Sequence, residues 1–373
     1  MSRPRILQLG KFYPPYMGGI ETHLEALCQH LRPFADVRVL AANTANTRVE
    51  ECRDGVAIVR LPPRLWLSTA PLCPSIASEI RRVGPDLLHL HLPHPGGMLG
   101  LLASGYRGPL VVTYHSDVVR QQWRAAPFHP FLRAALHRAH TIIATSHAYV
   151  ETSPVLRRFA SRCRVVPYGI PLERFENRDQ AQVAHLRAQF GDRIVLAVGR
   201  LVYYKGFDVL VEAMQDVAGH LVLIGDGPLL SSLRVRAERL GVNSRVTFAG
   251  GVANDALGPY YHAASVFVLP SIARSEAFGI VQLEALACGV PVVNTSLPSG
   301  VPEVSLDGVT GLTVRPGDPR ALGRAITRLL DDPQLRARYG SAGRARVAGD
   351  FTNARMGERV RQIYDDAFSG RWK

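Results

Sequence analysis

Short apolar runs alternate with longer stretches of helical periodicity along most of the chain. Runs rich in valine, isoleucine and leucine predict strands, whereas apolar residues three or four positions apart predict helices. Strands that are connected by helices form parallel sheets buried on both faces, so this pattern predicts an α/β protein. The predicted strands are 6–9, 37–41, 57–61, 86–91, 110–117, 141–145, 163–166, 194–198, 220–224, 246–248, 266–270, 292–295 and 311–314.

The alternation stops after residue 166 and starts again near residue 192. The interval opens with Pro-Tyr-Gly-Ile-Pro at 167–171, whose prolines and glycine are typical of a linker. A chain of 373 residues is long enough for two domains of ordinary size. We therefore expect one domain at 1–177 and a second at 178–351, followed by a last helix at 352–368.

Composition narrows the class of protein. No apolar run approaches the length of a membrane span, and Lys11 interrupts the first apolar stretch too early for a secretory signal, so a cytoplasmic protein is expected. The five cysteines are odd in number and form no C-x-x-C pair. This usage predicts neither a disulfide framework nor a zinc site.

The positive charge is unevenly distributed. Of the net charge of +13, residues 1–177 carry +9 and residues 178–373 carry +4, so the first half is expected to seek an anionic surface. Nucleic acid is not predicted, because there is no zinc-finger spacing, RNP-like aromatic motif or basic helix. Only three of the 44 basic residues are lysines, so the lysine at position 205, inside a motif, indicates that the chemistry at this position requires a lysine.

The segment 118–140 combines four arginines with interleaved aromatic residues and contains no acidic residue. Such a segment can lie on an anionic bilayer. Pro127 and Pro130 exclude a single long amphipathic helix. The alternative is an ordinary pair of solvated helices packed on the sheet.

The stretch 271–291 joins two predicted strands through a turn that carries Glu276 and a helix that carries Glu284. Residues eight apart on a helix are about 12 Å apart, whereas the carboxyl groups of glycosidases are roughly 5 to 9.5 Å apart. The two glutamates are therefore expected to hold different parts of one long ligand. Gly279 near the helix start lets backbone N–H groups face an anion. A sugar nucleotide fits this pattern, and a surface helix with two solvated glutamates is the alternative.

Glycines and histidines follow the ends of other predicted strands. Gly18-Gly19 can let the backbone approach a phosphate, although a loose turn is the alternative and the G-x-G-x-x-G fingerprint of nicotinamide-binding proteins is absent. His115 lies at the carboxyl end of the predicted strand 110–117, where ligands bind in open α/β sheets, with a structural role as the alternative. The histidines at 89, 91 and 94 have no carboxylates or cysteines nearby, so a metal site is not expected.

Five landmarks occur in a fixed order along nearly the whole chain. They are Gly18-Gly19, His115, Gly199-Arg200 with Lys205-Gly206, Gly225-Asp226-Gly227-Pro228, and Glu276-Ala277-Phe278-Gly279 with Glu284. With them the chain resembles the retaining glycosyltransferases of family GT4. The resemblance implies the GT-B fold, in which two facing Rossmann-like domains with parallel sheets enclose an interdomain cleft. It implies an acceptor-binding N-terminal domain, a nucleotide-sugar-binding C-terminal domain, and a C-terminal helix at 352–373 that packs back on the first domain.

The resemblance also implies roles for individual residues. Arg200 and Lys205 would clamp the diphosphate and stabilise the negative charge that develops on it as the sugar leaves. Glu276 would bind hydroxyls of the donor sugar, and Glu284 would accept hydrogen bonds from the ribose. His115 would contact the sugar near the reacting carbon.

Backbone groups complete the expected donor site. Gly18 and Gly19 would approach the diphosphate from the first domain. The amides of Phe278, Gly279 and Ile280 would lie near the sugar and phosphate. Gly251 and Val252 stand in the loop where relatives hold the base.

The local sequence at 274–284 and 295–302 looks most like that of bacterial mannosyl- or rhamnosyltransferases of surface-polysaccharide assembly. This resemblance favours GDP-mannose as the donor. The acceptor would be a glycan or a lipid-linked sugar at the inner membrane face, so the protein would be cytoplasmic or peripheral on that membrane. The absence of an aspartate-x-aspartate pair agrees with a metal-independent enzyme without a cofactor. In the mechanism usually proposed for the family, the departing phosphate helps to take the acceptor's proton on the same face, and no protein nucleophile is required.

Two other functions stay open. A sugar-nucleotide 2-epimerase on the same fold would need acid and base groups around the sugar, for which Glu276 and His115 are the candidates. A catalytically idle subunit that binds a partner would have no need of the diphosphate clamp formed by Arg200 and Lys205.

Overall fold

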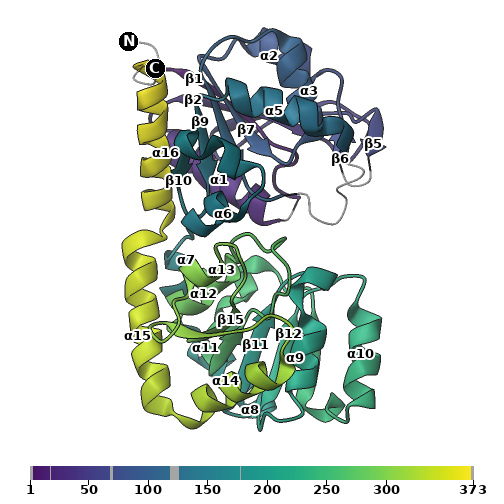
Figure 1. Ribbon diagram of the computed structural model, residues 1–373, viewed down its shortest axis with the longest axis vertical. Coiled ribbons are helices and arrows are strands. Elements are labelled where there is room, and N and C mark those ends of the chain that lie inside the picture. The colour runs from purple at the N-terminus through teal and green to yellow at the C-terminus, as the bar shows by residue number, and fades with distance from the viewer. Residues whose placement is uncertain (1–2, 17, 68–69, 118–125, 177, 371–373) are drawn as a thin grey trace. The chain divides into compact units, whose positions relative to one another are not determined.

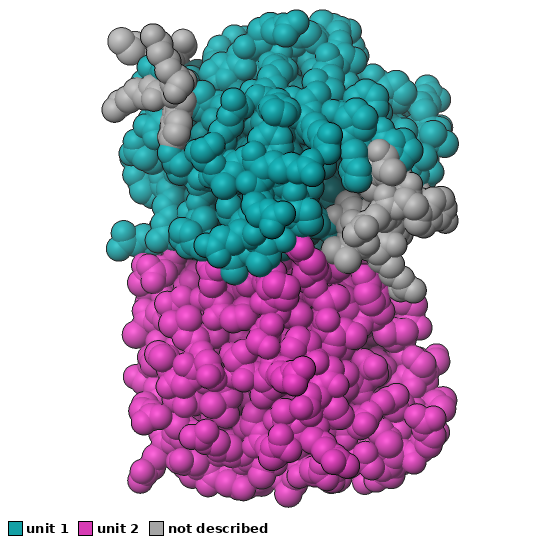
Figure 2. Space-filling model, viewed as in Figure 1, with its two compact units in different colours: residues 1–169, 353–373 teal, residues 170–352 magenta. Residues whose placement is uncertain are grey.

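The computed structural model describes residues 3–16, 18–67, 70–117, 126–176 and 178–370. The chain forms two compact units, shown in two colours in Figure 2: unit 1 is Met1–Gly169 with Asn353–Lys373, and unit 2 is Ile170–Thr352. The division therefore lies within the proline- and glycine-containing segment 167–171, a few residues before the boundary at 177/178 that the sequence predicted. The two connections between the units adjoin, because the Ile170 amide donates to the carbonyl of Phe351 at 2.9 Å.

Among the described residues, unit 2 is built on a six-stranded parallel sheet with the order β13-β12-β11-β14-β15-β16. Counted along the chain, this is the order 3-2-1-4-5-6 of dinucleotide-binding Rossmann folds. The direction of the connections reverses between the first and fourth strands. The strands are β11 (Ile194–Val198), β12 (His220–Ile224), β13 (Val246–Gly250), β14 (Val266–Val268), β15 (Val292–Thr295) and β16 (Gly311–Val314).

Helices cover both faces of this sheet. They are α7 (Glu173–Glu176), α8 (Gln180–Phe190), α9 (Phe207–Ala213), α10 (Leu230–Arg239), α11 (Gly258–Ala263), α12 (Val281–Ala287), α13 (Val301–Val304), α14 (Pro319–Asp331) and α15 (Pro333–Asp350). Val195 and Ala197 of β11 belong to one core with Ile326 of α14, because alternate side chains of a strand point to the same face. On the other face, the rings of Tyr261 in α11 and Phe267 in β14 lie with their centroids 5.7 Å apart.

In the described part of unit 1, eight strands form a sheet with the order β10-β9-β8-β7-β1-β2-β4-β3. The pairs are parallel except at the edge, where β3 runs antiparallel to β4. Gln8 of β1 lies beside His89 of β7 in the register, so their side chains share one face of the sheet. The strands are β1 (Arg5–Leu9), β2 (Asp36–Ala42), β3 (Val49–Arg53), β4 (Val56–Leu61), β7 (Leu87–Leu92), β8 (Leu110–Tyr114), β9 (Thr141–Ala144) and β10 (Cys163–Val165).

The last helix belongs to the first unit. Helix α16 (Asn353–Phe368), yellow in Figure 1, packs with α1 (Gly19–Leu31) on one face of the sheet. Leu27 of α1 and Val360 of α16 share a core with Val39 of β2. The other α-helices in the described part of unit 1 are α2 (Ile76–Val83), α3 (Pro95–Ser104), α5 (His129–Arg138) and α6 (His147–Thr152).

The predicted strands are present with small changes of length, and the predicted α/β class with two Rossmann-like units is confirmed. The sequence did not predict β3, the hairpin of β5 (Leu65–Leu67) and β6 (Ala70–Leu72), or α2 and α3. All five residues of β3 are exposed, so this strand has no apolar periodicity. Helix α3 contains three glycines, which are poor helix formers. Within the described ranges, no helix combines the length and the apolar character that crossing a membrane requires.

Candidate functional site

The loops that follow β11 and β14 meet at the carboxyl end of the sheet of unit 2. These strands are neighbours, and ligands of open α/β sheets bind where the direction of the connections reverses between two such strands. The loop after β11 carries Arg200 and Lys205, and the loop after β14 carries Glu276. The two loops are joined by a backbone hydrogen bond, in which the Ile272 amide donates to the Tyr204 carbonyl at 2.8 Å.

Lys205 and Glu276 form a buried ion pair between these loops. Lys205 Nζ lies 2.6 Å from Glu276 Oε2, and the two residues are 9% and 8% exposed. Ser271 Oγ donates to the same carboxylate oxygen at 3.3 Å. Burial by itself would lower the pKa of Lys205, but the Glu276 carboxylate and Tyr204 outweigh it, so the pKa is raised. The side chain is therefore held as an ammonium, whose three N–H donors exceed what one carboxylate oxygen accepts.

Gly206 allows the loop after β11 to approach the loop after β14. Its φ of +66° lies in the left-handed region that favours glycine. A Cβ atom at this position would also collide with the carbonyl oxygen of Pro270. The backbone therefore explains why a glycine follows Lys205, since a side chain at 206 would push Lys205 away from Glu276.

Arg200 stands at the start of the same loop, and its side chain is exposed. The structure shows no ion pair or hydrogen bond of its guanidinium with the described residues. The charge of Arg200 affects the pKa of Tyr204. Burial raises this pKa most, and the cations of Lys205 and Arg200 lower it in part. Of the two cations predicted to clamp a diphosphate, Lys205 is held by its ion pair with Glu276 and Arg200 faces solvent.

Glu284 lies on α12 and has a different partner from Glu276. The Tyr261 hydroxyl donates to Glu284 Oε2 at 2.5 Å. Burial raises the pKa of Glu284, whereas Tyr261 and Arg174 lower it in part. The predicted separation of about 12 Å along one helix is wrong, because α12 begins at Val281 and Glu276 precedes it. The distinct partners of the two carboxylates now support separate roles.

Phe278, Gly279 and Ile280 form the turn that leads into α12. Phe278 is buried, and Gly279 has a φ of +77°. The backbone N–H groups of Gly279 and Ile280 have no partner among the described residues, so they are available to an anion or a sugar oxygen. Helix α12 has only seven residues, so its dipole is short and the amides themselves are the stronger donors.

Gly251 and Val252 follow the edge strand β13. Gly251 is exposed and Val252 is half-buried. Strand β13 lies two positions from β11 in the sheet, which is about 10 Å at the usual strand spacing. The structure therefore places these two residues at the same end of the sheet as Lys205 and Glu276, but not in contact with them.

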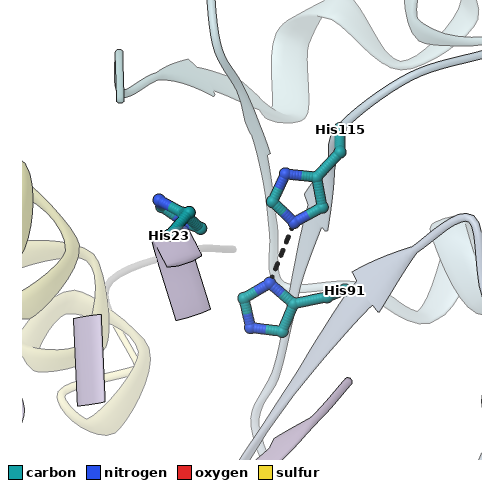
Figure 3. A group of neighbouring side chains, drawn as sticks. All are labelled: His23, His91 and His115. Atoms are coloured by element: carbon teal, nitrogen blue, oxygen red, sulfur yellow. Dashed lines mark hydrogen bonds between the residues drawn. The ribbon is translucent and has the colours of Figure 1, made fainter. Parts of the chain in front are cut away.

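Unit 1 places His115 in a buried cluster of histidines. Figure 3 shows His23 of α1, His91 of β7 and His115, which follows β8. The rings of His91 and His115 are stacked with centroids 5.3 Å apart, and His91 Nδ1 lies 3.0 Å from His115 Nε2. The ring of His23 lies edge-on to His115 at 5.3 Å.

A chain of buried hydrogen bonds fixes the proton positions in this cluster. Gln8 Oε1 accepts from Nε2–H of His91 at 2.9 Å, so His91 Nδ1 is left to accept from Nε2–H of His115. His115 Nδ1 then accepts from the Tyr168 hydroxyl at 2.5 Å. Gln8 Nε2 donates to the Tyr364 hydroxyl of α16 at 2.9 Å. Both ring nitrogens of His115 are thus engaged inside unit 1, and its ring offers a ligand only carbon atoms unless a bond is exchanged.

Four buried histidines of unit 1 are kept neutral. Burial lowers the pKa of His23 and of His89 to about 3, and His23 adds to the effect on His89. Burial and the neighbouring histidines lower the pKa of His91 and His115 well below the usual value. His89 extends the chain, because its Nδ1 accepts from Tyr364 and its Nε2 donates to Thr113 Oγ1 at 2.7 Å.

Gly18 and Gly19 form the start of α1, with Gly18 in an extended conformation before the first turn. A Cβ atom at Gly18 would collide with the carboxylate of Glu21. Glu21 is itself buried, and burial raises its pKa. The glycine at 18 therefore makes room for Glu21, a structural cause that stands beside the predicted approach to a phosphate.

Three histidines could hold a metal ion. One nitrogen each of His23, His91 and His115 lies within 4.8 Å of the others, and neutral imidazoles suit metal ligation. This set differs from the histidines at 89, 91 and 94, at which the sequence predicted no metal site. A metal would have to replace the bond between His91 and His115, so the expectation of a metal-independent reaction stays a prediction.

The basic and aromatic segment 118–140 is described only in part, since residues 118–125 lie outside the described residues. The rest contains α5, which buries Ala135 and Leu136 and exposes Phe131 and Arg133. This helix packs against α3. The described half thus fits the helix packed on the domain, and the predicted membrane contact stays a prediction.

Polar residues that were not predicted from the sequence form buried hydrogen bonds around both candidate sites. They are Gln8, Tyr168 and Tyr364 in unit 1, and Tyr261, Gln282 and Asn294 in unit 2. A signal was present for two of them. Gln8 and Asn294 interrupt apolar strands of parallel sheets, and a polar side chain buried there has to find a hydrogen-bond partner.

Two family models match the chain. The model described as "Glycosyltransferase Family 4" matches residues 17–174, and the model described as "Glycosyl transferases group 1" matches residues 179–346. The first match runs through the segment 167–171 and ends at residue 174, and the second begins at residue 179, within unit 2.

Relatives with similar sequences cover almost the full length. The chain is 31% identical over 348 residues to a D-rhamnosyltransferase, WbpZ of Pseudomonas aeruginosa, covering 91% of each chain. It is 31% identical to a GDP-mannose-dependent alpha-(1-6)-phosphatidylinositol monomannoside mannosyltransferase of Mycolicibacterium smegmatis, covering 94% of this chain and 96% of the relative.

Solved structures share the fold. A sucrose-phosphate synthase from Thermosynechococcus elongatus superimposes with a TM-score of 0.84 at 26% identity, over 99% of this chain and 100% of the other. The Anabaena protein HepE, solved with UDP and glucose, gives a TM-score of 0.80 at 21% identity over 97% of this chain and 100% of the other. At that identity the second likeness shows the fold alone.

Proposed function

The chain belongs to glycosyltransferase family 4 and has the GT-B fold, and from this we propose that it moves a hexose from a nucleoside-diphosphate sugar to a hydroxyl of a glycan or lipid-linked acceptor, with retention of configuration. That it is a glycosyltransferase follows from its family. The donor, the acceptor and the stereochemistry are the proposal. The localisation proposed with it is cytoplasmic, peripheral on the inner membrane face.

The observation that carries the proposal is the buried pair of Lys205 and Glu276 at the switch point of unit 2. A diphosphate bound there would meet an ammonium that Glu276 keeps charged, with Arg200 free to close from solvent. Because Lys205 is buried, its charge would act on the leaving group more strongly than it would in water. Glu276 would also accept hydrogen bonds from hydroxyls of the donor sugar.

The rest of the donor would extend along the carboxyl end of the sheet. The amides of Gly279 and Ile280 would donate to the sugar and phosphate. Glu284 would accept hydrogen bonds from the ribose hydroxyls. These bonds would either replace the hydrogen bond from Tyr261 or be made in addition to it. Gly251 and Val252, about two strand spacings from β11, would flank the base. Phe278 would support this turn from the core, where it is buried.

The reaction proposed is a displacement at the anomeric carbon. The bond between that carbon and the diphosphate oxygen breaks, and its electron pair stays on the phosphate, where Lys205 and Arg200 stabilise it. The acceptor hydroxyl forms the new bond on the same face and gives its proton to the departing phosphate oxygen. From unit 1, the carbon edge of His115 is proposed to contact the sugar, and the backbone of Gly18 and Gly19 to contact the diphosphate.

GDP-mannose is the donor proposed first. A relative of 31% identity is a GDP-mannose-dependent phosphatidylinositol monomannoside mannosyltransferase, and another relative is an O-antigen chain mannosyltransferase of Escherichia coli. These relatives, together with the D-rhamnosyltransferase, favour a mannosyl or rhamnosyl donor. They also favour an acceptor that belongs to a lipid-linked or surface glycan.

A thermal-shift panel with GDP, UDP, ADP and dTDP tests the donor. A ligand that binds the folded state raises the melting temperature with concentration, so GDP is expected to stabilise the protein most. Transfer from GDP-mannose to a mannoside acceptor is then followed by NMR of the anomeric proton. An inverted product would refute retention, and a preference for UDP would refute the donor.

Two controls separate the alternatives. Incubation with GDP-mannose alone is expected to yield no epimer, and rapid epimerisation without acceptor would replace the transferase by a 2-epimerase. Dialysis against EDTA is expected to leave transfer unchanged, since cationic side chains and backbone amides serve the leaving group. Loss of transfer that a divalent cation restores would refute metal independence.

A further inference from the structure

Three histidines meet in the interior of unit 1 from three different elements. His23 lies on α1, His91 on β7, and His115 directly after the neighbouring strand β8 (Figure 3). The His115 amide donates to the Leu92 carbonyl at 3.0 Å, which ties the backbones that carry His91 and His115 together. The three side chains are 6%, 2% and 2% exposed. One nitrogen of each ring lies within 4.8 Å of the other two. We call these residues the three-histidine group.

His23 is the member of the group that the buried hydrogen bonds leave out. Its Nδ1 atom is shut off from solvent and has no hydrogen-bond partner in the part of the chain that the structure describes. The ring instead faces other rings, with centroids 5.3 Å away at His115 and 4.8 Å away at Tyr168. Burying a polar nitrogen without a partner is unfavourable, because its hydration is lost and nothing replaces it. A metal ion bound by the group would supply a partner for the His23 ring.

The bonds that a ligating histidine needs from its surroundings are already present at His91. Its Nε2–H donates to Gln8 Oε1 at 2.9 Å, so the lone pair of Nδ1 faces His115. A histidine that binds a metal through one ring nitrogen typically donates its other N–H to such an oxygen, which fixes the tautomer and the orientation of the ring. Gln8 therefore prepares His91 to bind a cation through Nδ1.

His115 becomes a ligand by exchanging its two hydrogen bonds. Its Nε2–H now donates to His91 Nδ1, and its Nδ1 accepts from the Tyr168 hydroxyl. Moving the ring proton from Nε2 to Nδ1 frees the Nε2 lone pair for the cation. The Nδ1–H then donates to the Tyr168 oxygen, since a hydroxyl both donates and accepts. The number of protons on the ring is unchanged.

The spacing of the nitrogens needs only small adjustments. Zinc–nitrogen bonds of about 2.0 to 2.1 Å in a tetrahedral site place two ligating nitrogens about 3.4 Å apart. His91 Nδ1 and His115 Nε2, now 3.0 Å apart, would separate by about 0.4 Å. The nitrogen of His23 would approach by no more than about 1.4 Å, since it already lies within 4.8 Å of both. Small rotations of the side chains provide shifts of this size.

We propose that the three-histidine group is a binding site for a divalent transition-metal cation, and that a bound cation lowers glycosyl transfer. Imidazole nitrogens suit Zn²⁺ and its neighbours Co²⁺, Ni²⁺ and Cu²⁺, whereas Mg²⁺ and Ca²⁺ prefer oxygen ligands. The cation is not assigned to the leaving group. The proposal therefore adds an inhibitory site to a reaction that itself is proposed to need no metal.

The inhibition rests on the proposed function, in which the ring of His115 contacts the donor sugar. The anomeric carbon becomes electron-poor as its bond to the phosphate breaks. A cation held beside that ring would add positive charge where positive charge is already developing, and like charges repel most strongly in a buried site. Coordination would also fix the His115 ring in one tautomer.

The number of ligands indicates a reversible site. Structural zinc sites have four protein ligands, whereas sites with three keep a position open. The three imidazoles are neutral, so they leave the charge of the ion uncompensated in the interior of unit 1. We therefore expect occupancy to follow the concentration of the metal, and EDTA to empty the site.

Calorimetry with the metal alone tests binding, on protein that carries no histidine tag and has been dialysed against EDTA. The wild type is expected to bind Zn²⁺ and Co²⁺ but not Mg²⁺, and bound Co²⁺ should show the visible absorption of a nitrogen-ligated ion. His23→Phe should weaken binding at least about tenfold, as losing even an outer partner of a ligand does. His23→Asn is a smaller second variant that gives the same reading if the phenyl ring disturbs folding.

The matched control is His94→Gln. His94 is also buried in unit 1, and neither of its ring nitrogens has a hydrogen-bond partner among the described residues, but it lies outside the three-histidine group. This variant should bind Zn²⁺ like the wild type. Nitrogen-15 NMR of the histidine rings gives a second reading, since Zn²⁺ should shift the signals of His91 and His115 in the wild type and in the control.

Transfer is measured for each protein with and without Zn²⁺, and the ratio of the two rates is compared. Zinc is expected to slow the wild type and His94→Gln at least about tenfold, a cautious figure for opposing the charge of a transition state. The same zinc concentration should slow His23→Phe much less. If the zinc-free wild type transfers no sugar at all, the proposed function fails, while calorimetry still decides whether the metal site exists.

Three results would overturn the proposal. The first is that the wild type binds neither Zn²⁺ nor Co²⁺. The second is that His23→Phe and His23→Asn bind Zn²⁺ as tightly as His94→Gln, which would place the metal elsewhere on the protein. The third is that Zn²⁺ binds with the expected ligands and leaves transfer unchanged, which would remove the inhibitory role.

Discussion

At the scale of single residues, the buried pair of Lys205 and Glu276 combines a structural and a chemical role. Each charge is compensated by the other in a dry environment, which is why the pKa of Lys205 is raised despite burial. Removing one partner of such a pair leaves the other charge unpaired and destabilises a protein by about 3 to 5 kcal/mol. A loss of activity after a single substitution therefore needs a control for folding.

We expect Lys205→Ala to lower turnover at least about a hundredfold, the effect of removing one donor that stabilises transition-state charge. The double variant Lys205→Ala with Glu276→Gln should recover much of the stability, because no unpaired carboxylate remains, and it should stay as inactive. Turnover is measured at saturating donor and stability by urea unfolding. Activity that returned together with stability would reduce the pair to a structural role.

The buried histidines make the stability of unit 1 depend on pH. Below about pH 6.5 the unfolded chain takes up protons on its histidines, whereas His23 and His89, with pKa values of about 3, stay neutral in the folded protein. Stability that is complete above pH 6.5 should therefore fall as the pH drops toward 3. Each such histidine should contribute up to about 1.4 kcal/mol per pH unit.

Urea unfolding at pH 7, 6 and 5 measures this slope. His89→Gln should make the slope shallower, because one buried neutral histidine is removed. His129→Gln, which changes an exposed histidine on α5, should leave it unaltered. A free energy of unfolding that did not change between pH 6.5 and 5 would contradict the account.

At the scale of elements, α16 is tied to the sheet of unit 1 by a polar contact as well as by its apolar face. The Tyr364 hydroxyl accepts from Gln8 and donates to His89, in the interior of the unit. The same chain of hydrogen bonds continues through His91 to His115. The last helix of the chain is in this way connected to a residue that the family resemblance assigns to the donor sugar.

We expect Tyr364→Phe to lower the free energy of unfolding by about 1 to 3 kcal/mol, since it leaves buried polar atoms of Gln8 and His89 without a partner. Arg361→Ala on the exposed side of the same helix is the control and should change stability much less. Nitrogen-15 NMR of the histidine rings provides a second reading. Unchanged ring signals of His91 in Tyr364→Phe would show that the chain does not transmit the change.

At the scale of the whole molecule, the uneven charge has a consequence for location. Residues 1–177 carry +9 of the net charge of +13, and basic residues near an anionic bilayer each contribute about 1 kcal/mol. One of the two proposed classes of acceptor is a lipid-linked glycan. Attraction to an anionic membrane would bring the enzyme to such an acceptor.

Flotation with liposomes tests this attraction. The protein is expected to float with vesicles that contain phosphatidylglycerol, and less so as salt is raised from 50 to 300 mM, because screening weakens exposed charges. Phosphatidylcholine vesicles alone should bind it poorly. Binding that ignored both lipid charge and salt would leave the segment 118–140 and the charge asymmetry without a role at the membrane.

The sequence by itself determined the class of fold and singled out the residues of the candidate site, whose roles stay predictions. Strands such as β11 and β15 were predicted with their observed bounds, because their apolar runs and flanking glycines are local signals. Lys205 and Glu276 were found because a rare lysine and a carboxylate stand in loops after strands, where parallel sheets bind ligands. The short, exposed β3 and the glycine-rich α3 carry no such signal and were missed.

Only the tertiary structure decided which of these residues touch. The pairing of Lys205 with Glu276, of Glu284 with Tyr261, and of His115 with His91 joins segments far apart along the chain. No local periodicity encodes such contacts, which arise from strand order, register and the close approach that Gly206 allows. The ring contact between Trp66 and Phe12 has the same origin, since it joins segments that lie apart in the sequence.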